Sequence, residues 1–289
     1  MQLIPSLALA ALLATSAGAK AASGPSTTYV VLSAPGALDV PPDPERPPVA
    51  ALSPAEVDVE ITHLREALSR EVPYLAPDIA EREAQWVRLA AAALSAAGQV
   101  IDRPQLVIVV DRSPRVQELC IVVVRPEGPW QVVAGAKIST GQPGRFDHFI
   151  TPVGVFLNTD AVLGYRAKGT FNENHIRGFG RKGMRVWDFG WQRAVKTWRP
   201  DREEGEIRLL MHATDPDRLE QRLGRQASQG CIRIPATMNR FLDRHGVIDA
   251  DYERAAAEDP RFRALLAPDR TPTPLAGNAL IVVDSSLAR

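Results

Sequence analysis

From residue 105 onward the sequence is divided into short aliphatic runs, and this pattern restricts the possible folds more than any other feature. Runs rich in Val, Ile and Leu recur about every ten residues, and segments rich in Gly, Pro, Asp and Ser separate them. We expect strands at residues 106–110, 119–124, 130–138, 153–157, 207–211 and 280–283. Short strands with this spacing predict a mainly β fold of the sandwich or barrel-like kind.

Helical patterns lie on both sides of this β-rich region. Before it, Ser53 is followed by a proline and by Glu56, which is the order of a capping box and predicts a helix start. Residues 53–100 then carry apolar side chains at helical spacing, with a second helix expected from near Asp78 to Gly98. After the region, we expect helices at residues 236–244 and 251–266. We interpret the N-terminal helical pair as a packing module, with binding of a partner as the alternative.

The N-terminus has the features of an export signal. Residues 3–14 are almost wholly apolar, and two patterns of the A-x-A type follow before residue 22, although no Lys or Arg precedes the apolar run. We therefore predict a signal peptide at residues 1–21, with a buried N-terminal helix as the alternative. Residues 22–52 contain a proline-rich stretch that predicts a linker. No later segment is long and apolar enough to span a membrane, so we expect an exported protein that does not span one.

The composition excludes several classes of protein. The 34 basic and 34 acidic side chains balance, which argues against nucleic acid as a partner. Two cysteines are too few for a disulfide-rich scaffold or a zinc site with four thiolates. The five histidines are scattered and form no short pair with a cysteine. We accordingly expect neither a metal nor a cofactor.

The two cysteines occur in different contexts. Cys120 lies inside an aliphatic run and is expected to be buried as a small apolar side chain. Cys231 follows Gly230 among polar residues, which predicts a turn where backbone N–H groups could bind a developing oxyanion. His212 follows the run at residues 207–211, and strand ends hold catalytic side chains rigidly. These residues alone leave a catalytic thiol, a structural thiol, a disulfide and a zinc ligand as alternatives.

Three motifs in a fixed order give the residues around Cys231 a more specific meaning. They are S-T-G-Q-P-G at residues 139–144, T-P-V-G-V-F at residues 151–156, and His212 followed after 15 residues by S-Q-G-C-I-R at residues 228–233. This arrangement resembles the catalytic domain of the L,D-transpeptidase family of the YkuD type, over about residues 105–244. Two positions depart from the family pattern, since Gln229 replaces the usual histidine and Ala213 replaces the glycine that commonly follows the first histidine.

The resemblance implies a cysteine acyltransferase that acts on peptidoglycan stem peptides. Cys231 would attack the carbonyl of the third residue of a tetrapeptide, and His212 would hold the thiolate and move the protons. An amine acceptor would then form a 3→3 cross-link. Gly230, Ser228 and Arg233 would serve as oxyanion or substrate-binding residues, with a structural tie to the backbone as the alternative for Arg233. The alternatives in function are an L,D-carboxypeptidase or hydrolase with the same nucleophile and a non-catalytic peptidoglycan-binding protein.

The resemblance also implies an organisation and a location. Residues 104–289 would form the catalytic domain together with a C-terminal extension, and the helical segment at residues 53–100 lies outside the family match. The segment at residues 164–206 would contribute a lid over the site or would be a packed insertion. The protein would act as a monomer in the periplasm or cell envelope.

Overall fold

The computed structural model describes residues 52–77 and 79–287. The predicted signal peptide at residues 1–21 and all but the last residue of the predicted linker lie outside this part of the chain. Within the described residues, no helix combines the length and the apolar character that crossing a bilayer requires.

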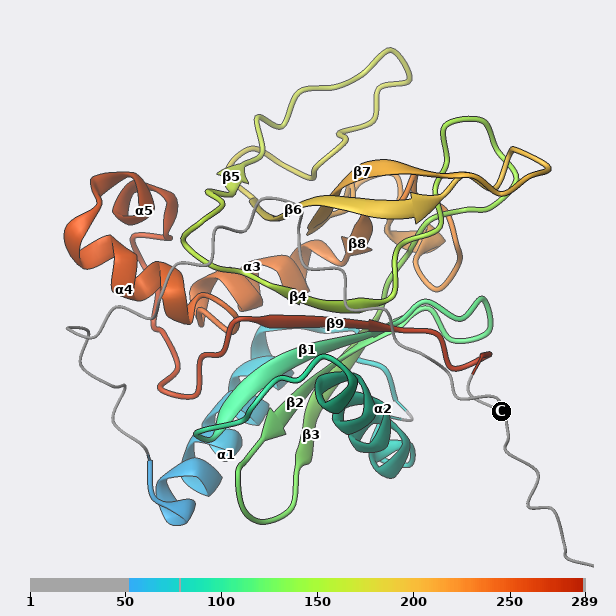
Figure 1. Ribbon diagram of the computed structural model, residues 1–289. Helices are drawn as coiled ribbons and strands as arrows, with labels where there is room; N and C mark the ends of the chain where they lie inside the picture. Colours follow the sequence, from blue (N-terminus) through green and yellow to red (C-terminus); the bar gives the residue numbers. More distant parts are fainter. Residues whose placement is uncertain (1–51, 78, 288–289) are drawn as a thin grey trace, which may run out of the picture.

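In the described residues, the strands form two mixed sheets (Figure 1). The first sheet has the order β3–β2–β1–β9–β4, and β1 pairs in parallel with β9 while its other pairs are antiparallel. Its strands are β1 (Gln105–Asp111), β2 (Glu118–Val124), β3 (Gln131–Lys137), β4 (Gly154–Leu157) and β9 (Ala279–Val283). The second sheet has the order β5–β6–β7–β8, and its β7–β8 pair is parallel. Its strands are β5 (Tyr165–Arg166), β6 (Arg185–Val195), β7 (Glu204–Ala213) and β8 (Ile232–Ile234).

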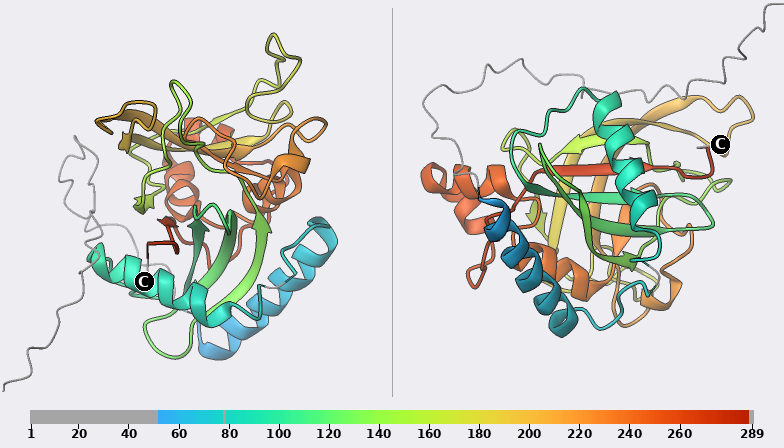
Figure 2. Two further views of the ribbon diagram at one scale, coloured as in Figure 1. Left: turned by 90° about the vertical axis from the view of Figure 1, so that its right-hand side faces the viewer. Right: turned by 90° about the horizontal axis from the view of Figure 1, so that it is seen from below.

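Helices pack around these sheets and between them. They are α1 (Pro54–Glu71), α2 (Glu83–Ala96), α3 (Ala236–Arg244), α4 (Ala250–Glu258) and α5 (Pro260–Leu265), with a short 3-10 helix, η1 (Glu220–Arg222). The predicted capping box of α1 is confirmed, because the Ser53 side chain accepts from the Glu56 backbone N–H and the Glu56 carboxylate accepts from the Ser53 N–H. Figure 2 shows α2 across the first sheet, on the side away from the second sheet. The apolar side chains of α2 pack there against those of β1, β2 and β9.

The facing sides of the two sheets share one apolar core. In the second sheet, Leu209 and Met211 of β7 and Ile232 and Ile234 of β8 belong to this core, together with alternate residues of β1 and β2. Successive side chains of a strand point to opposite faces. In β7 and β8, the residues that alternate with these core positions therefore lie on the outer face of the second sheet. This face carries the candidate site.

The fold prediction is confirmed in part. Every run that was expected to be a strand contains one, and the helices expected after residue 235 are present as α3, α4 and α5. The described residues form a mixed α/β structure, in which helices and strands contain about equal numbers of residues. The second N-terminal helix begins at Glu83, later than the predicted start near residue 78. The long strand β6 was not predicted, because its alternation is interrupted by a bulge between Asp188 and Trp191.

Candidate active site

The pairing of β7 with β8 brings Cys231 and His212 to the same face. In this parallel pair Met211 lies opposite Ile232, and His212 lies opposite Arg233. Met211 and Ile232 both point into the core. Their neighbours Cys231, His212 and Arg233 therefore lie on the outer face of the second sheet. The structure thus gathers the predicted nucleophile, base and cation on one surface.

His212 is held by its own backbone neighbour. Its Nδ1 lies 2.8 Å from the carbonyl oxygen of Ala213, and because a carbonyl only accepts, Nδ1 carries the hydrogen in this contact. The ring is buried, and Phe179 packs edge-on against it with 4.8 Å between ring centroids. The pKa of His212 is lowered to about 4, chiefly by burial, with the bond to Ala213 opposing the change and the charge of Arg233 adding to it. The imidazole is therefore neutral at pH 7, with Nε2 able to accept a proton.

Cys231 lies in the turn just before β8. It is partly buried and packs against an apolar cluster that includes Val186 and Leu210. Its Sγ lies 3.9 Å from the carbonyl oxygen of Arg208. Burial raises the pKa of the Cys231 thiol, and both the Leu210 N–H and the charge of Arg233 act in the opposite direction. The raised pKa of the thiol and the lowered pKa of the imidazole both favour the neutral forms of the two groups.

Ser228 organises the turn that carries the thiol. Its Oγ accepts from the Gly230 N–H at 3.1 Å and donates to the Cys231 carbonyl at 2.5 Å. This geometry fits a loop hydrogen-bonding role for Ser228. The Gly230 N–H is occupied by this bond, so its predicted role as an oxyanion donor would require the bond to open. Gly230 itself has φ of +134°, a conformation that favours glycine.

The two upstream motifs pack around the same turn. Thr151 is fully buried, and its Oγ1 accepts from the Gly141 N–H at 2.9 Å and donates to the Gly230 carbonyl at 2.7 Å. The Ser228 N–H donates to the Thr140 carbonyl at 3.0 Å. A Cβ on Gly141 would lie 1.9 Å from the backbone oxygen of Phe149, so this position requires glycine. Hydrogen bonds to backbone groups of the Cys231 turn therefore hold this turn against the two upstream motifs, which lie some 80 residues earlier in the chain.

Arg233 forms a structural tie. Its Nη1 donates to the Ala227 carbonyl at 3.1 Å, and its backbone pairs with Ser139 through two hydrogen bonds. Burial lowers the pKa of Arg233, and Cys231 counteracts this change. The arginine thus holds the loop and also places a positive charge near the thiol and the imidazole.

Three residues near the thiol were missed by sequence reasoning. Asp188 lies opposite Leu210 on the outer face, and its carboxylate pairs with the Nε of Arg208 at 2.9 Å. Burial raises the pKa of Tyr165, as do the nearby charges of Asp188 and Cys231. Tyr165 of β5 and Asp188 of β6 lie on the far side of β7 from Cys231, and Arg208 lies on β7 itself. Sequence reasoning missed these residues because it predicted neither the strand β6 nor its pairing with β7.

The segment at residues 164–206 contributes both sheet and loop to the site. Its strands β5 and β6 belong to the second sheet, and the loop between them brings Phe179 against His212 and Tyr165. Arg177 in this loop pairs with Asp217 at 2.6 Å and also with a carboxylate oxygen of buried Asp215. A pocket of about 430 Å³ lies beside Tyr165 and Phe179. The loop therefore lies over the imidazole side of the site.

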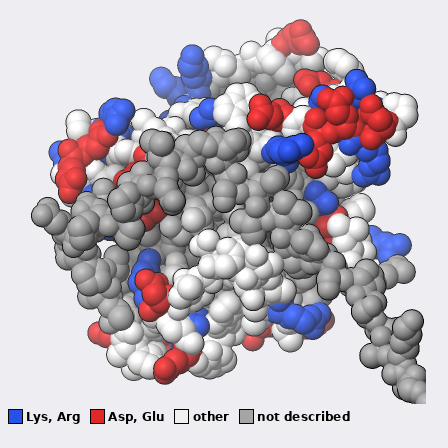
Figure 3. Space-filling view, in the orientation of Figure 1, with Lys and Arg blue, Asp and Glu red and all other residues white. Residues whose placement is uncertain are grey.

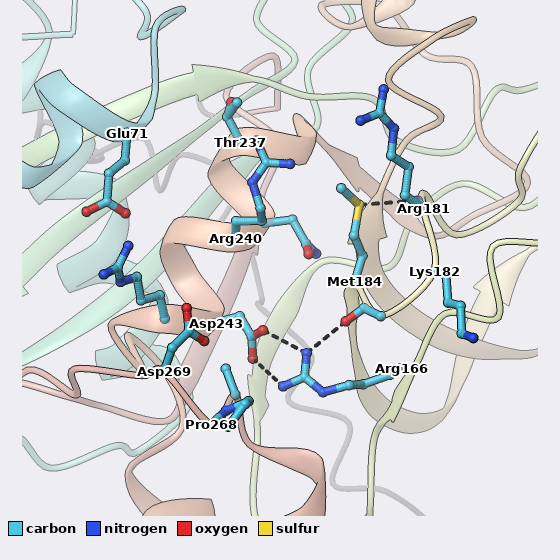
Figure 4. Close-up of a pocket in the computed structure, with 14 residues that line it drawn as sticks. Glu71, Arg166, Arg181, Lys182, Met184, Thr237, Arg240, Asp243, Pro268 and Asp269 are labelled. Carbon is cyan, nitrogen blue, oxygen red and sulfur yellow. Dashed lines mark hydrogen bonds and ion pairs between the residues drawn. The ribbon is translucent and has the colours of Figure 1, made fainter.

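A second pocket, of about 640 Å³, lies away from Cys231 and His212, along α3 (Figure 4). Figure 4 shows Arg166 directed toward Asp243, with which it forms two bonds of 2.8 and 3.1 Å. Arg166 also donates to the backbone carbonyls of Gly183 and Leu265. These contacts fasten β5 and the following loop to the C-terminal helices, so we assign this pocket a structural role in supporting the site.

Charge on the molecular surface is mixed. Figure 3 shows acidic and basic side chains interspersed on the face drawn, most densely where the β6–β7 hairpin lies. Ion pairs in this hairpin include Arg193–Glu204 and Lys196–Glu203. Recognition of a charged ligand would accordingly depend on individual residues near the thiol.

The chain matches no family model, and no curated protein sequence matches it either. Among the described residues, no three His, Cys, Asp or Glu side chains are grouped so that they could hold a metal ion.

Proposed function

We propose that this protein is an exported peptidoglycan L,D-transpeptidase that uses Cys231 as its nucleophile and His212 as its general acid and base. The observation that carries the proposal is the β7–β8 register, which places a partly exposed thiol and a neutral, carbonyl-oriented imidazole on one face. The motifs at residues 139–144 and 151–156 meet at the same turn, as expected if all three motifs serve one site. The finer fold that we propose is the sandwich-like catalytic fold of this family.

The first half-reaction would form a thioester. The Cys231 Sγ attacks the carbonyl carbon of the third residue of the donor stem while His212 Nε2 takes the thiol proton. The tetrahedral intermediate then collapses, the bond to the terminal D-Ala nitrogen breaks, and the imidazolium protonates that leaving amine. The Cys231 acyl-enzyme and free D-Ala result, with His212 neutral again.

The second half-reaction would release the product. An acceptor amine attacks the thioester carbonyl while His212 Nε2 removes a proton from the attacking nitrogen. The carbon–sulfur bond breaks, the new amide forms, and the proton returns to the Cys231 sulfur. A buried base with a pKa near 4 is neutral at the start of each half-reaction, and neutrality is what proton acceptance requires.

One experiment tests the nucleophile and the reaction together. Purified protein is incubated with tetrapeptide muropeptides, and the products are separated and identified by mass spectrometry. We expect 3→3 cross-linked dimers from the parent protein and from Cys120→Ala, the matched variant that removes the buried thiol, and none from Cys231→Ala. Tripeptides without dimers would support the hydrolase alternative. Equal activity of Cys231→Ala and the parent would refute the assignment.

A further inference from the structure

The pocket along α3 is lined by three basic side chains that have no ion-pair partner within the described part of the chain. They are Lys182, Arg240 and Arg244. The other two basic residues of the lining are paired, Arg166 with Asp243 and Arg181 with Asp217. The structural contacts of this pocket therefore leave three of its cations unused.

The acidic residues of the pocket do not cancel these three charges. Asp243 is paired with Arg166, and a carboxylate oxygen of Glu71 lies 3.3 Å from the Nε2 of His245. Asp269 is the acidic lining residue that has no ion-pair partner among the described residues. The three unpaired cations and this one carboxylate together carry an excess of two positive charges.

Polar side chains line the pocket along one face of α3. Thr237, Arg240 and Arg244 are three and four residues apart, which is the spacing that brings helical side chains to the same face. A helix rises about 1.5 Å per residue, so this face extends for about 10 Å. Figure 4 shows Thr237 and Arg240 on α3, with Lys182 and Met184 contributed by the chain just before β6. Donors from two separate segments therefore face the same space.

The size and lining of the pocket suit a small ligand. Its volume of about 640 Å³ is within the range of about 300–1,000 Å³ that ligand sites have. Met184 and Ala267 are buried and offer an apolar wall. Arg240 and Lys182 are exposed, so their charged ends can be reached from solvent. The pocket thus combines accessible cations with an apolar surface.

We propose that this pocket binds a dianionic phosphate group between Arg240 and Arg244 of α3 and Lys182. A phosphate monoester carries a charge of about −1.5 to −2 at pH 7, which matches the excess of two positive charges, whereas a carboxylate carries a single charge. Arginine donates parallel hydrogen bonds to phosphate oxygens, and lysine binds phosphate as a point charge. Free phosphate and the phosphate end of a small organic molecule share this chemistry. The site is separate from Cys231 and does not depend on the proposed function.

A bound phosphate would connect two elements of the fold. Lys182 belongs to the loop in which Phe179 packs against His212, while Arg240 and Arg244 belong to α3. Without an anion the three cations repel one another, and a phosphate between them replaces repulsion with attraction. Because added salt screens such charges, with a Debye length of about 10 Å at 0.1 M, we expect binding to weaken as the salt concentration rises.

The test measures the binding of inorganic phosphate to the purified protein by isothermal titration calorimetry. The titration is made at low ionic strength and about pH 8, where phosphate is largely dianionic. Acetate at the same ionic strength is the monoanionic control. We expect saturable binding of one phosphate per chain, with acetate at least about tenfold weaker, since each further charge-assisted contact contributes more than a tenfold gain in affinity. Glycerol 3-phosphate distinguishes the two sources, because tighter binding than that of phosphate indicates a monoester ligand and weaker binding indicates the free ion.

Variants of the cations identify the residues responsible. The double variant Arg240→Gln, Arg244→Gln should bind phosphate at least about tenfold more weakly than the parent, and Lys182→Gln should also bind it more weakly. Glutamine is a good helix former, so the exposed changes in α3 should leave the fold intact, as circular dichroism can confirm. The matched control is Arg88→Gln, which removes an exposed arginine of α2 outside the pocket and should bind phosphate like the parent.

Three results would overturn the proposal. The first is a parent protein that shows saturable binding of neither phosphate nor glycerol 3-phosphate, and this result needs no variant to fold. The second is equal affinity for phosphate and acetate, which would refute a site for a dianion. The third is a folded Arg240→Gln, Arg244→Gln variant that binds phosphate as tightly as the parent and the Arg88→Gln control do, which would place the phosphate elsewhere.

Discussion

Replacement of Thr151 by valine tests the way in which the upstream motifs hold the Cys231 turn. Valine has nearly the shape of threonine, but a methyl group replaces the hydroxyl. The change removes the bond from the Gly141 N–H to Oγ1 and the bond from Oγ1 to the Gly230 carbonyl, both of which are buried. Thr151→Val therefore leaves one donor and one acceptor unpaired in the interior.

The size of the effect follows from these two groups. Each unsatisfied buried polar group costs about 1–3 kcal/mol, so Thr151→Val should lower the free energy of unfolding by about 2–6 kcal/mol. The matched variant Thr151→Ser keeps the hydroxyl and loses one buried methyl group, which costs about 1 kcal/mol. The expected order of stability is parent, then the serine variant, then the valine variant well below both.

Denaturation in urea measures this order, and alkylation of Cys231 by iodoacetamide follows the turn in the same samples. In native conditions we expect Thr151→Val to change the alkylation rate of Cys231 more than Thr151→Ser does, because only valine releases the Gly230 carbonyl. If the two variants unfold within about 0.5 kcal/mol of each other, the bonds through Oγ1 do not stabilise the turn and the reasoning is wrong.

The other predictions concern buried charge and the two thiols. The folded pKa of His212, about 4, lies below the ordinary value of 6.5, so the unfolded chain binds more protons between these values. As the pH falls from 6.5 to 4, up to about 3 kcal/mol of the free energy of unfolding should be lost. His212→Asn should lose less over the same pH range, and an equal loss in this variant would contradict the prediction. Iodoacetamide should label partly exposed Cys231 before fully buried Cys120, as peptide mass spectrometry can decide. Asp249→Asn should cost about 3–5 kcal/mol, because it leaves the fully buried Arg185 charge without its partner, and thermal unfolding checks this value.

Much of the first sheet could be predicted from the sequence, because its strands β1, β2 and β9 are buried on both faces. Residues 119–124 form an uninterrupted aliphatic run, and β2 is buried along almost all of its length. The strand β6 gives no such signal. It carries a glycine at position 190 within its bulge, and Trp191 after the bulge points outward. A bulge shifts the alternation by which a half-buried strand is identified, so the strand is visible only through its pairing with β7.

The site could be predicted where its residues are close in sequence or carried by a motif. The motif that carries the family resemblance contains Cys231, His212 and Ser228, and the structure brings these residues to one side of the second sheet or its adjoining turn. Asp188 and Arg208 could not be found in this way, because charged residues on a strand are usually solvated surface groups. Only the cross-strand register shows that this pair is next to the thiol.

The chemistry of the site depends on the register of β8 against β7. Ile232 and Ile234 are fully buried in the shared core, while Cys231 and Arg233 alternate with them toward the outer face. A slip of one residue would turn Cys231 into the core and bring Ile232 to the surface. The short strand is held against such a slip by its buried isoleucines and by the paired bonds between Arg233 and Ser139. The S-T-G motif, which begins at Ser139, thus fixes which face receives the thiol, and the reactivity of Cys231 follows from backbone pairing as much as from its own surroundings.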